Sequence, residues 1–141
     1  MFSRNGLCFV CFSCALILIL AHSAAAGIVK DTYWTNAGGG SWNASGNWDN
    51  GVPDSTTAAI FNLGELSAYT VSFAASAQAG EMRVRSGEII FNLSGQTLDV
   101  VDLLFVGYDV GDDAHLQLVN GSLTSAWADV GHYTGTGGAP G

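Results

Sequence analysis

The apolar positions of the second half of the chain form one pattern that occurs twice. Apolar residues alternate with polar ones in each copy, as in Phe91-Asn92-Leu93, and this is the two-residue period of a β-strand. The copies keep one constant offset at their first three positions, and the closing Val-Gly pair comes one position earlier in the second copy. A fixed period of about 25 residues is typical of stacked repeats, so each copy is predicted to be one coil of a parallel β-solenoid. The two copies are Phe91-x-Leu93-x₄-Leu98 with Val106-Gly107, and Leu116-x-Leu118-x₄-Leu123 with Val130-Gly131.

These apolar positions are predicted to point inward and to stack in register between coils. A charged replacement such as Leu118→Asp is then expected to unfold the domain, because an unpaired buried carboxylate costs several kcal/mol. The predicted core positions of the two copies are Phe91, Leu93, Leu98, Leu116, Leu118 and Leu123.

A degenerate earlier coil precedes the two copies. It contains Val71-x-Phe73 and then Met82-x-Val84, which stands slightly less than one period before Leu104-x-Val106. Residues 63–134 then hold about two and a half coils, fewer than the three that such stacks generally require. The glycine-rich loop 135–141 offers no apolar cap over the last coil. We therefore predict an all-β, parallel β-solenoid that is truncated at its C-terminal end.

Aromatic residues set among glycine, asparagine and serine dominate residues 27–62. Trp34, Trp42 and Trp48 follow one another closely in the sequence, which invites a carbohydrate-stacking interpretation. The alternative is an N-terminal cap, because a repeat stack needs a plug over its open end and large aromatic side chains bury much area. The sequence favours the cap. A turn at 51–55, with Pro53 fixing φ, is predicted to lead into the first strand at 58–61.

Residues 1–26 have the features of a secretory signal peptide. Arg4 supplies the positive charge, residues 8–20 are apolar apart from Ser13, and 24–26 form an A-x-A cleavage site before Gly27. The apolar run is shorter than the roughly 20 residues that a membrane span requires. Cys8, Cys11 and Cys14 all lie inside this segment, so cleavage leaves a chain without cysteine. We expect a secreted or cell-surface protein with no membrane insertion of the mature chain.

The mature chain is strongly acidic. Removal of Arg4 leaves Lys30, Arg83 and Arg85 against 12 acidic residues, or 3 − 12 = −9. Such a surface repels nucleic acid and anionic lipid, and we exclude a nucleic-acid partner. Glycine, serine, threonine and asparagine are abundant, and no long stretch keeps a helical apolar stripe. The composition therefore agrees with a turn-rich β protein.

The mature chain also resembles a known group of exported proteins. The residues that carry the resemblance are Trp34, Gly39-Gly40-Ser41-Trp42, Asn47-Trp48, Gly51-Val52-Pro53, Ala59-x-Phe61, Tyr69-Thr70-Val71-x-Phe73 and the Val-Gly-ended repeats. This order is similar to the N-terminal region of large bacterial β-solenoid proteins with autotransporter-associated or PEP-CTERM-type β-strand repeats, common in planctomycete-like bacteria. The resemblance covers about residues 32–131. It implies a surface or extracellular protein and supplies no catalytic residues; a C-terminal sorting segment and a translocator barrel are absent from the sequence.

Candidate chemistry is sparse. Asp109, Asp112 and Asp113 lie between the two copies, where carboxylate oxygens would suit Ca²⁺. Their spacing matches neither an EF-hand nor the glycine-rich nonapeptide repeat, and the sequence favours solvated acidic turn residues. His115 and His132 lack partners at metal-ligand spacing and are expected to face solvent. The facing of Trp127 stays open between core and exposed sugar contact. No catalytic residue and no cofactor are assigned.

Three functions remain open from the sequence. The favoured one is an exported structural or adhesive surface protein without catalytic activity of its own. The second is the N-terminal fragment of a β-helix polysaccharide-degrading enzyme, whose catalytic coils would lie beyond Gly141. The third is a carbohydrate-binding module that uses Trp34, Trp42 and Trp48. The expected partners are extracellular polysaccharide or other surface proteins.

Overall fold

The computed structural model of the chain describes residues 27, 30–64, 68–109 and 111–131. The predicted signal peptide (1–26), the loop 135–141 and His132 lie outside the described residues. Within the described part no helix is long and apolar enough to cross a membrane. The elements are β1 (Lys30–Tyr33), β2 (Gly40–Ser41), the 3₁₀ turn η1 (Ser45–Asn47), β3 (Thr57–Asn62), β4 (Tyr69–Ser72), β5 (Ala77–Ala79), β6 (Glu81–Asn92), β7 (Thr97–Val106), β8 (Asp113–Val119) and β9 (Ser122–Val130).

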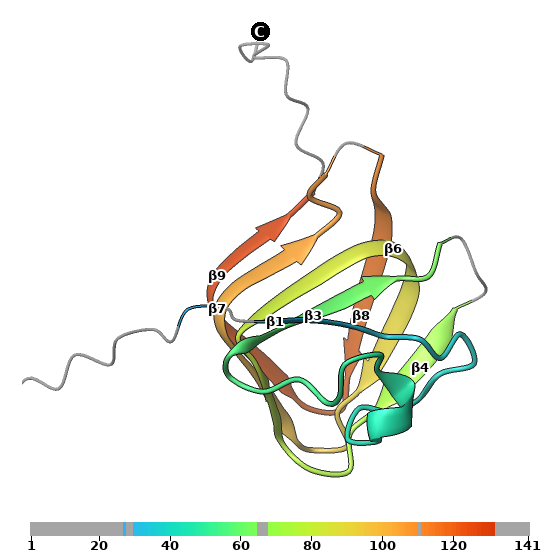
Figure 1. Cartoon of the computed structure of the whole chain (residues 1–141), viewed down its shortest axis with the longest axis vertical. Coiled ribbons are helices and arrows are strands. Elements are labelled where there is room, and N and C mark those ends of the chain that lie inside the picture. The colour runs from blue at the N-terminus through green and yellow to red at the C-terminus, as the bar shows by residue number, and fades with distance from the viewer. Residues whose placement is uncertain (1–26, 28–29, 65–67, 110, 132–141) are drawn as a thin grey trace, which may run out of the picture.

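The strands wind into a parallel β-solenoid of about four turns, which confirms the predicted fold class (Figure 1). Three parallel ladders form its faces. The first ladder contains β1, β3, the start of β6, the end of β7 and the end of β9. The second contains β2, β4, the end of β6 and β8. The third contains β5, the start of β7 and the start of β9.

Long strands pass from one face to the next through local irregularities. In β6 the bend falls near Gly87, whose φ of 92° is a left-handed conformation that glycine adopts without strain. Next to this bend the pairing of β3 with β6 shifts register between Phe61 and Asn62. In β7 the bend coincides with a register shift between Val100 and Leu103. These bulges let one strand serve two faces, because a bulge bends its strand.

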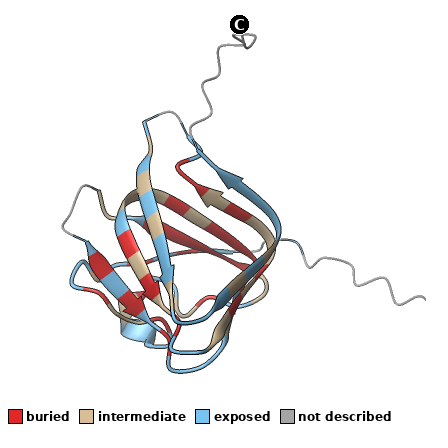
Figure 2. Ribbon diagram, turned by 180° about the vertical axis from the view of Figure 1, so that it is seen from behind, coloured by how far each residue is buried: buried red, intermediate tan, exposed pale blue. Residues whose placement is uncertain are grey.

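The core consists of columns of inward-pointing residues that repeat from coil to coil. One column follows the register Thr32, Ala59, Met82, Leu104 and Ala128 along the first ladder. Its members are buried except for Ala128 in the last coil. Buried and less buried positions alternate along the central strands, as the two-residue strand period requires (Figure 2). The predicted correspondence of Met82 with Leu104 is confirmed.

Residues 27–62 do more than cap the solenoid, which was the role predicted for them. Both β1 and β3 pair in parallel within the first ladder, so residues 27–62 contribute strands to the solenoid as well as covering its end. This addition raises the coil number from the expected two and a half to about four. The strand predicted at 58–61 is present as β3, but β1 was not predicted and neither strand was assigned to a coil. Their spacing is irregular, since the pairing of Thr32 with Ala59 spans more of the chain than the pairings between later coils on this ladder.

The pairing between the two sequence copies is shifted by two residues on one face. The repeat predicted that Phe91 would pair with Leu116, but Phe91 pairs with Leu118. Leu98 pairs with Leu123, as predicted. The difference arises at the corner, because residues 93–96 separate β6 from β7 whereas only residues 120–121 separate β8 from β9. A shift of two residues keeps the same side chains facing inward.

The last coil is only partly covered. Leu116 and Leu123 are partly buried against the core, but Leu118 is 44% exposed and Val130 is 71% exposed. The prediction that all six repeat positions are buried is therefore wrong for Leu118. The physical reason is its place in the stack, since no described strand lies beyond β8 on that ladder. A carboxylate at this position would reach solvent, and Leu118→Asp is no longer expected to unfold the domain.

Candidate functional site

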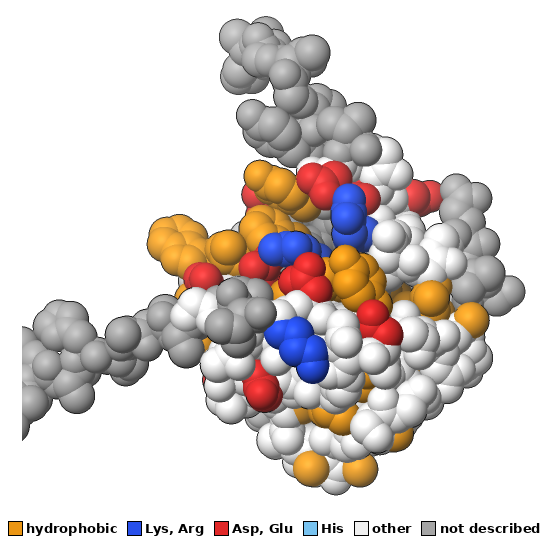
Figure 3. Space-filling view, viewed as in Figure 1, with side chains coloured by type: hydrophobic (Ala, Val, Ile, Leu, Met, Phe, Trp, Pro, Cys, Tyr) orange, Lys and Arg blue, Asp and Glu red, His pale blue; other side chains and the backbone are white. Residues whose placement is uncertain are grey.

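A pocket lies on the outer surface of the first ladder. It has a volume of about 410 Å³ and lies where β6, β7 and residues 108, 109 and 112 meet. Charged and hydrophobic side chains gather on this face of the molecule (Figure 3). We call this feature the outer pocket; its lining residues are Glu81, Arg83, Val84, Arg85, Leu103, Phe105, Tyr108, Asp109 and Asp112.

Strand β6 supplies one wall of the outer pocket. Glu81, Arg83 and Arg85 alternate with the inward-pointing Met82 and Val84, so the three charged side chains share the outer face. Nε of Arg83 donates a hydrogen bond to Oε1 of Glu81. The Glu81 side chain is 7% exposed and that of Arg83 is 40% exposed. The buried carboxylate therefore fixes a guanidinium group that still reaches solvent. Its hydrogen bond raises the pKa of Arg83, which stays charged.

Asp109 and Asp112, which lie between β7 and β8, place two carboxylates beside Arg85. Nη2 of Arg85 donates to Oδ2 of Asp109 at 2.7 Å, and Nε of Arg85 lies 3.7 Å from Oδ1 of Asp112. Asp109 and Asp112 also bond to each other, because the backbone N–H of Asp109 donates to Oδ2 of Asp112 and that of Asp112 donates to the Asp109 carbonyl, each at 3.0 Å. Asp112 is 12% exposed and Asp109 54%. Asp112 thus lies behind Arg85, and Asp109 lies at the rim.

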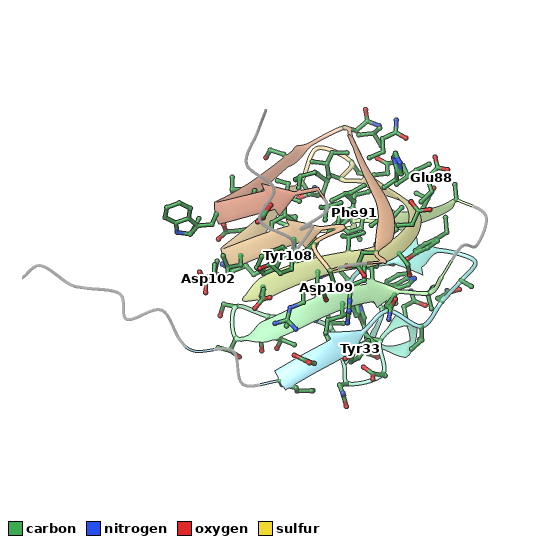
Figure 4. All side chains as sticks on the ribbon, turned by 90° about the horizontal axis from the view of Figure 1, so that it is seen from above. Tyr33, Glu88, Phe91, Asp102, Tyr108 and Asp109 are labelled. Carbon is green, nitrogen blue, oxygen red and sulfur yellow. The ribbon has the colours of Figure 1, made fainter. Side chains whose placement is uncertain are left out.

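Two aromatic rings complete the outer pocket. Gly107 continues the ladder by donating to the Val84 carbonyl at 2.9 Å, and its φ of 65° then turns the chain back. This turn brings the Tyr108 ring to 4.6 Å from the Phe105 ring, measured between centroids. Tyr108 is 38% exposed, so part of the ring pair faces solvent. Tyr108 and Asp109 lie together above β6 and β7 (Figure 4).

The calcium interpretation of the aspartates is not supported by this geometry. Asp109 and Asp112 come together, but the charge between them is the guanidinium of Arg85. Asp113 begins β8 and pairs in register with Ser86. Among the described residues no three histidine, cysteine or acidic side chains form a group suited to a metal ion. His115 is exposed on β8, as expected.

The three tryptophans proposed for sugar stacking are core residues. Trp34 is 1% exposed, Trp42 is 0% and Trp48 is 4%, so none presents an indole face to solvent. Their rings pack edge to face, with centroids 5.1 Å apart for Trp34 and Trp48 and 4.9 Å for Trp42 and Trp48. The carbohydrate-stacking interpretation of these residues is corrected, since stacking needs an open ring face. Burial of these large aromatic side chains at the N-terminal end removes much apolar surface from water.

Trp127 is the tryptophan that the structure exposes. It is 71% exposed on β9 and pairs in register with Leu103, which lines the outer pocket. The sequence left the facing of Trp127 open because alanine flanks it on both sides. Its strand partner decides the question, since Leu104 and Ala128 occupy the inward column.

The outer pocket was not predicted from the sequence. The sequence does contain a signal that could have revealed it: Arg85 and Asp109 stand one coil period apart, the same spacing that relates Val106 to Val130. Opposite charges one period apart on an outward face indicate a contact between neighbouring coils. The Glu81-x-Arg83-x-Arg85 alternation was a second signal.

Comparison of the chain with family models, curated proteins and solved structures finds no match. The fold therefore defines the class: a parallel β-solenoid protein with an aromatic-rich N-terminal end and a charged and aromatic pocket on one outer face.

Proposed function

We propose that this protein is an exported structural or adhesive surface protein without catalytic activity of its own. The observation that carries the proposal is the unbroken parallel stacking of the first ladder from β1 to β9. Each coil is stabilised mainly by its neighbours, so a solenoid forms a stiff, elongating support on which outward side chains are displayed.

Features of both ends of the described solenoid support this role. The aromatic cluster of Trp34, Trp42 and Trp48 closes the N-terminal end and leaves no indole face of its own open there. At the other end β8 and β9 expose apolar side chains and a strand edge within the described part of the chain. Such an edge accepts further strands, which suits a protein that grows by coils or assembles on a surface.

The sequence supports export. Residues 1–26 match a secretory signal, and residues 32–131 resemble exported bacterial β-solenoid proteins with autotransporter-associated or PEP-CTERM-type repeats. The acidic mature chain, with a net charge of 3 − 12 = −9, favours solubility outside the cell and repels anionic lipid.

The proposal is tested by locating the native protein in its source cells. An antibody raised against the folded chain should label intact cells or find the protein in the medium, and mass spectrometry should place its N-terminus within a few residues of Gly27. A matched variant, Ile17→Arg, interrupts the apolar run of residues 8–20 and should keep the protein inside the cell. Retention of the parent chain in the cytoplasm with Met1 intact would contradict the proposal.

A further inference from the structure

We propose that the outer pocket binds a neutral saccharide. Its lining combines exposed guanidinium donors, a carboxylate acceptor and an aromatic pair within one hollow of about 410 Å³. Pockets that hold small molecules have volumes of about 300 to 1,000 Å³, so the outer pocket is suited to a mono- or disaccharide unit.

The polar groups of the outer pocket match the hydrogen-bonding needs of sugar hydroxyls. A hydroxyl both donates and accepts, so it can accept from a guanidinium and donate to a neighbouring carboxylate. Arg83 and Arg85 have side chains that are 40% and 39% exposed, and Asp109 is 54% exposed. These groups are the ones that a ligand can reach.

Ion pairs fix the position of these donors. The buried Glu81 accepts a hydrogen bond from Arg83, and Asp109 accepts one from Arg85, whose Nε also lies 3.7 Å from the partly buried Asp112. Because the arginine side chains are already ordered by ion pairs, little further side-chain freedom is lost when a ligand binds. Each guanidinium group has five N–H donors, more than its ion pairs use, so donors remain for a ligand.

The aromatic pair supplies the apolar surface that a sugar ring requires. Tyr108 packs against Phe105, with an angle of 49° between the rings, and remains 38% exposed. The C–H face of a pyranose packs on such a surface while its hydroxyls turn toward the charged wall. Leu103 extends this surface toward the exposed Trp127.

The charge of the pocket favours a neutral ligand over an anionic one. Arg83 and Arg85 face Glu81, Asp109 and Asp112, which gives 2 − 3 = −1 within the lining. The whole chain carries −8, so a uronic acid or sulfated sugar would be repelled on approach. Both guanidinium groups are also already paired with carboxylates.

This inference rests on the proposed function for its setting, because it gives the adhesive role a ligand. The two are tested separately. Binding is measured on the purified full chain, whereas export is measured in cells, so failure of one leaves the other standing.

The test uses a panel of soluble neutral oligosaccharides of glucose, mannose, galactose and xylose, with uronic acid and sulfated oligosaccharides beside them. Saturation-transfer difference NMR identifies the bound sugar, and isothermal titration calorimetry gives its Kd. The variant Tyr108→Ala removes the aromatic contact and should weaken binding of the neutral sugar about tenfold. His115→Ala is the control, because the His115 ring is exposed on β8 in the second ladder and does not line the outer pocket.

The expected result is a neutral ligand whose affinity falls in Tyr108→Ala and is unchanged in His115→Ala. Arg83→Lys, which keeps the charge and loses the planar donor group, should weaken the same ligand and serves if Tyr108→Ala does not fold by circular dichroism. Equal affinity of the parent, Tyr108→Ala and Arg83→Lys would overturn the proposal. Selective binding of the anionic sugars, or binding of no sugar in the panel, would also overturn it.

Discussion

Gly121 lies directly against Leu93 at the corner between β8 and β9. A β-carbon added at Gly121 would meet the Leu93 side chain and would lie 2.6 Å from the carbonyl oxygen of Gln96. The last coil therefore crosses the previous one with no room for a side chain, and Leu93 is 0% exposed. The corner of the last coil is two residues shorter than the corner before it, and it turns directly over Leu93.

Gly121→Ala should destabilise the protein by about 1 to 3 kcal/mol, because overpacking forces the backbone of the corner to shift. The free energy of unfolding in urea measures the effect. Gly46→Ala is the control, since a β-carbon at Gly46 meets nothing within 4 Å. Equal losses in both variants would show that the corner does not lie against Leu93.

The two leucines of the repeat should differ sharply in what they contribute to stability. Leu93→Ala removes a fully buried side chain and should cost about 2 to 5 kcal/mol. Leu118→Ala removes a side chain that is 44% exposed in the last coil and should cost about 1 kcal/mol or less. Urea unfolding of both variants measures the difference, and a similar cost would mean that another segment covers β8.

The sequence was sufficient for the fold class because the two-residue alternation and the coil period are local properties of the chain. It correctly paired Met82 with Leu104 and Leu98 with Leu123. It did not place Phe91 opposite Leu118, because that pairing depends on the length of a corner rather than on the apolar pattern.

The site was harder to predict than the fold. Trp34, Trp42 and Trp48 suggested a sugar site because they lie close together in the sequence. Whether their rings are exposed depends on their place in the stack of coils, and there they are buried. The contact between Arg85 and Asp109 joins neighbouring coils, and it becomes visible only after the coils have been set in register. Side chains outside the core follow no apolar period, so their contacts require the three-dimensional register.

Tyr69→Phe should leave stability unchanged or raise it by about 1 kcal/mol, because removal of an unpaired buried polar group relieves its desolvation penalty. The Tyr69 hydroxyl is buried without a hydrogen-bond partner among the described residues, and burial raises the pKa of the phenol. The ring keeps its stacking on Trp34 in the variant. Tyr33→Phe, at an exposed position, is the control in the same thermal unfolding experiment. A clear loss of stability in Tyr69→Phe alone would show that the hydroxyl has a partner.

Asp54 should make stability depend on pH at the turn before β3. Its Oδ1 accepts hydrogen bonds from Thr56 N at 2.9 Å, Thr56 Oγ1 at 2.8 Å and Thr57 Oγ1 at 2.7 Å. The bond from Thr57 and those from Thr56 lower the pKa of Asp54 below the ordinary 3.8. At pH values near and below 3.8 the unfolded chain therefore binds more protons than the folded chain. The stabilising contribution of the ionised Asp54 is present above pH 3.8 and is lost as the pH falls through the lower pKa of the folded state.

Asp54→Ala should accordingly cost about 1 kcal/mol or less at neutral pH, because the carboxylate is exposed and solvent screens its interactions. The difference from the parent should shrink as the pH drops below 3.8. Urea unfolding across this range measures it, with Asp129→Ala, at an exposed position, as the control. A difference that does not change with pH would contradict the assigned hydrogen bonds.

Parallel stacking in the stated register is most directly tested by an engineered disulfide between β6 and β8. Glu88 and His115 are exposed and pair in register, and paired strands lie about 4.8 Å apart, within the range that a disulfide spans. With Cys8, Cys11 and Cys14 replaced by serine, Glu88→Cys with His115→Cys should oxidise fully in the folded protein. The pair Glu88→Cys with Asp113→Cys, which matches the offset of the sequence repeat, should stay reduced. Bond formation in the second pair and not in the first would contradict the register.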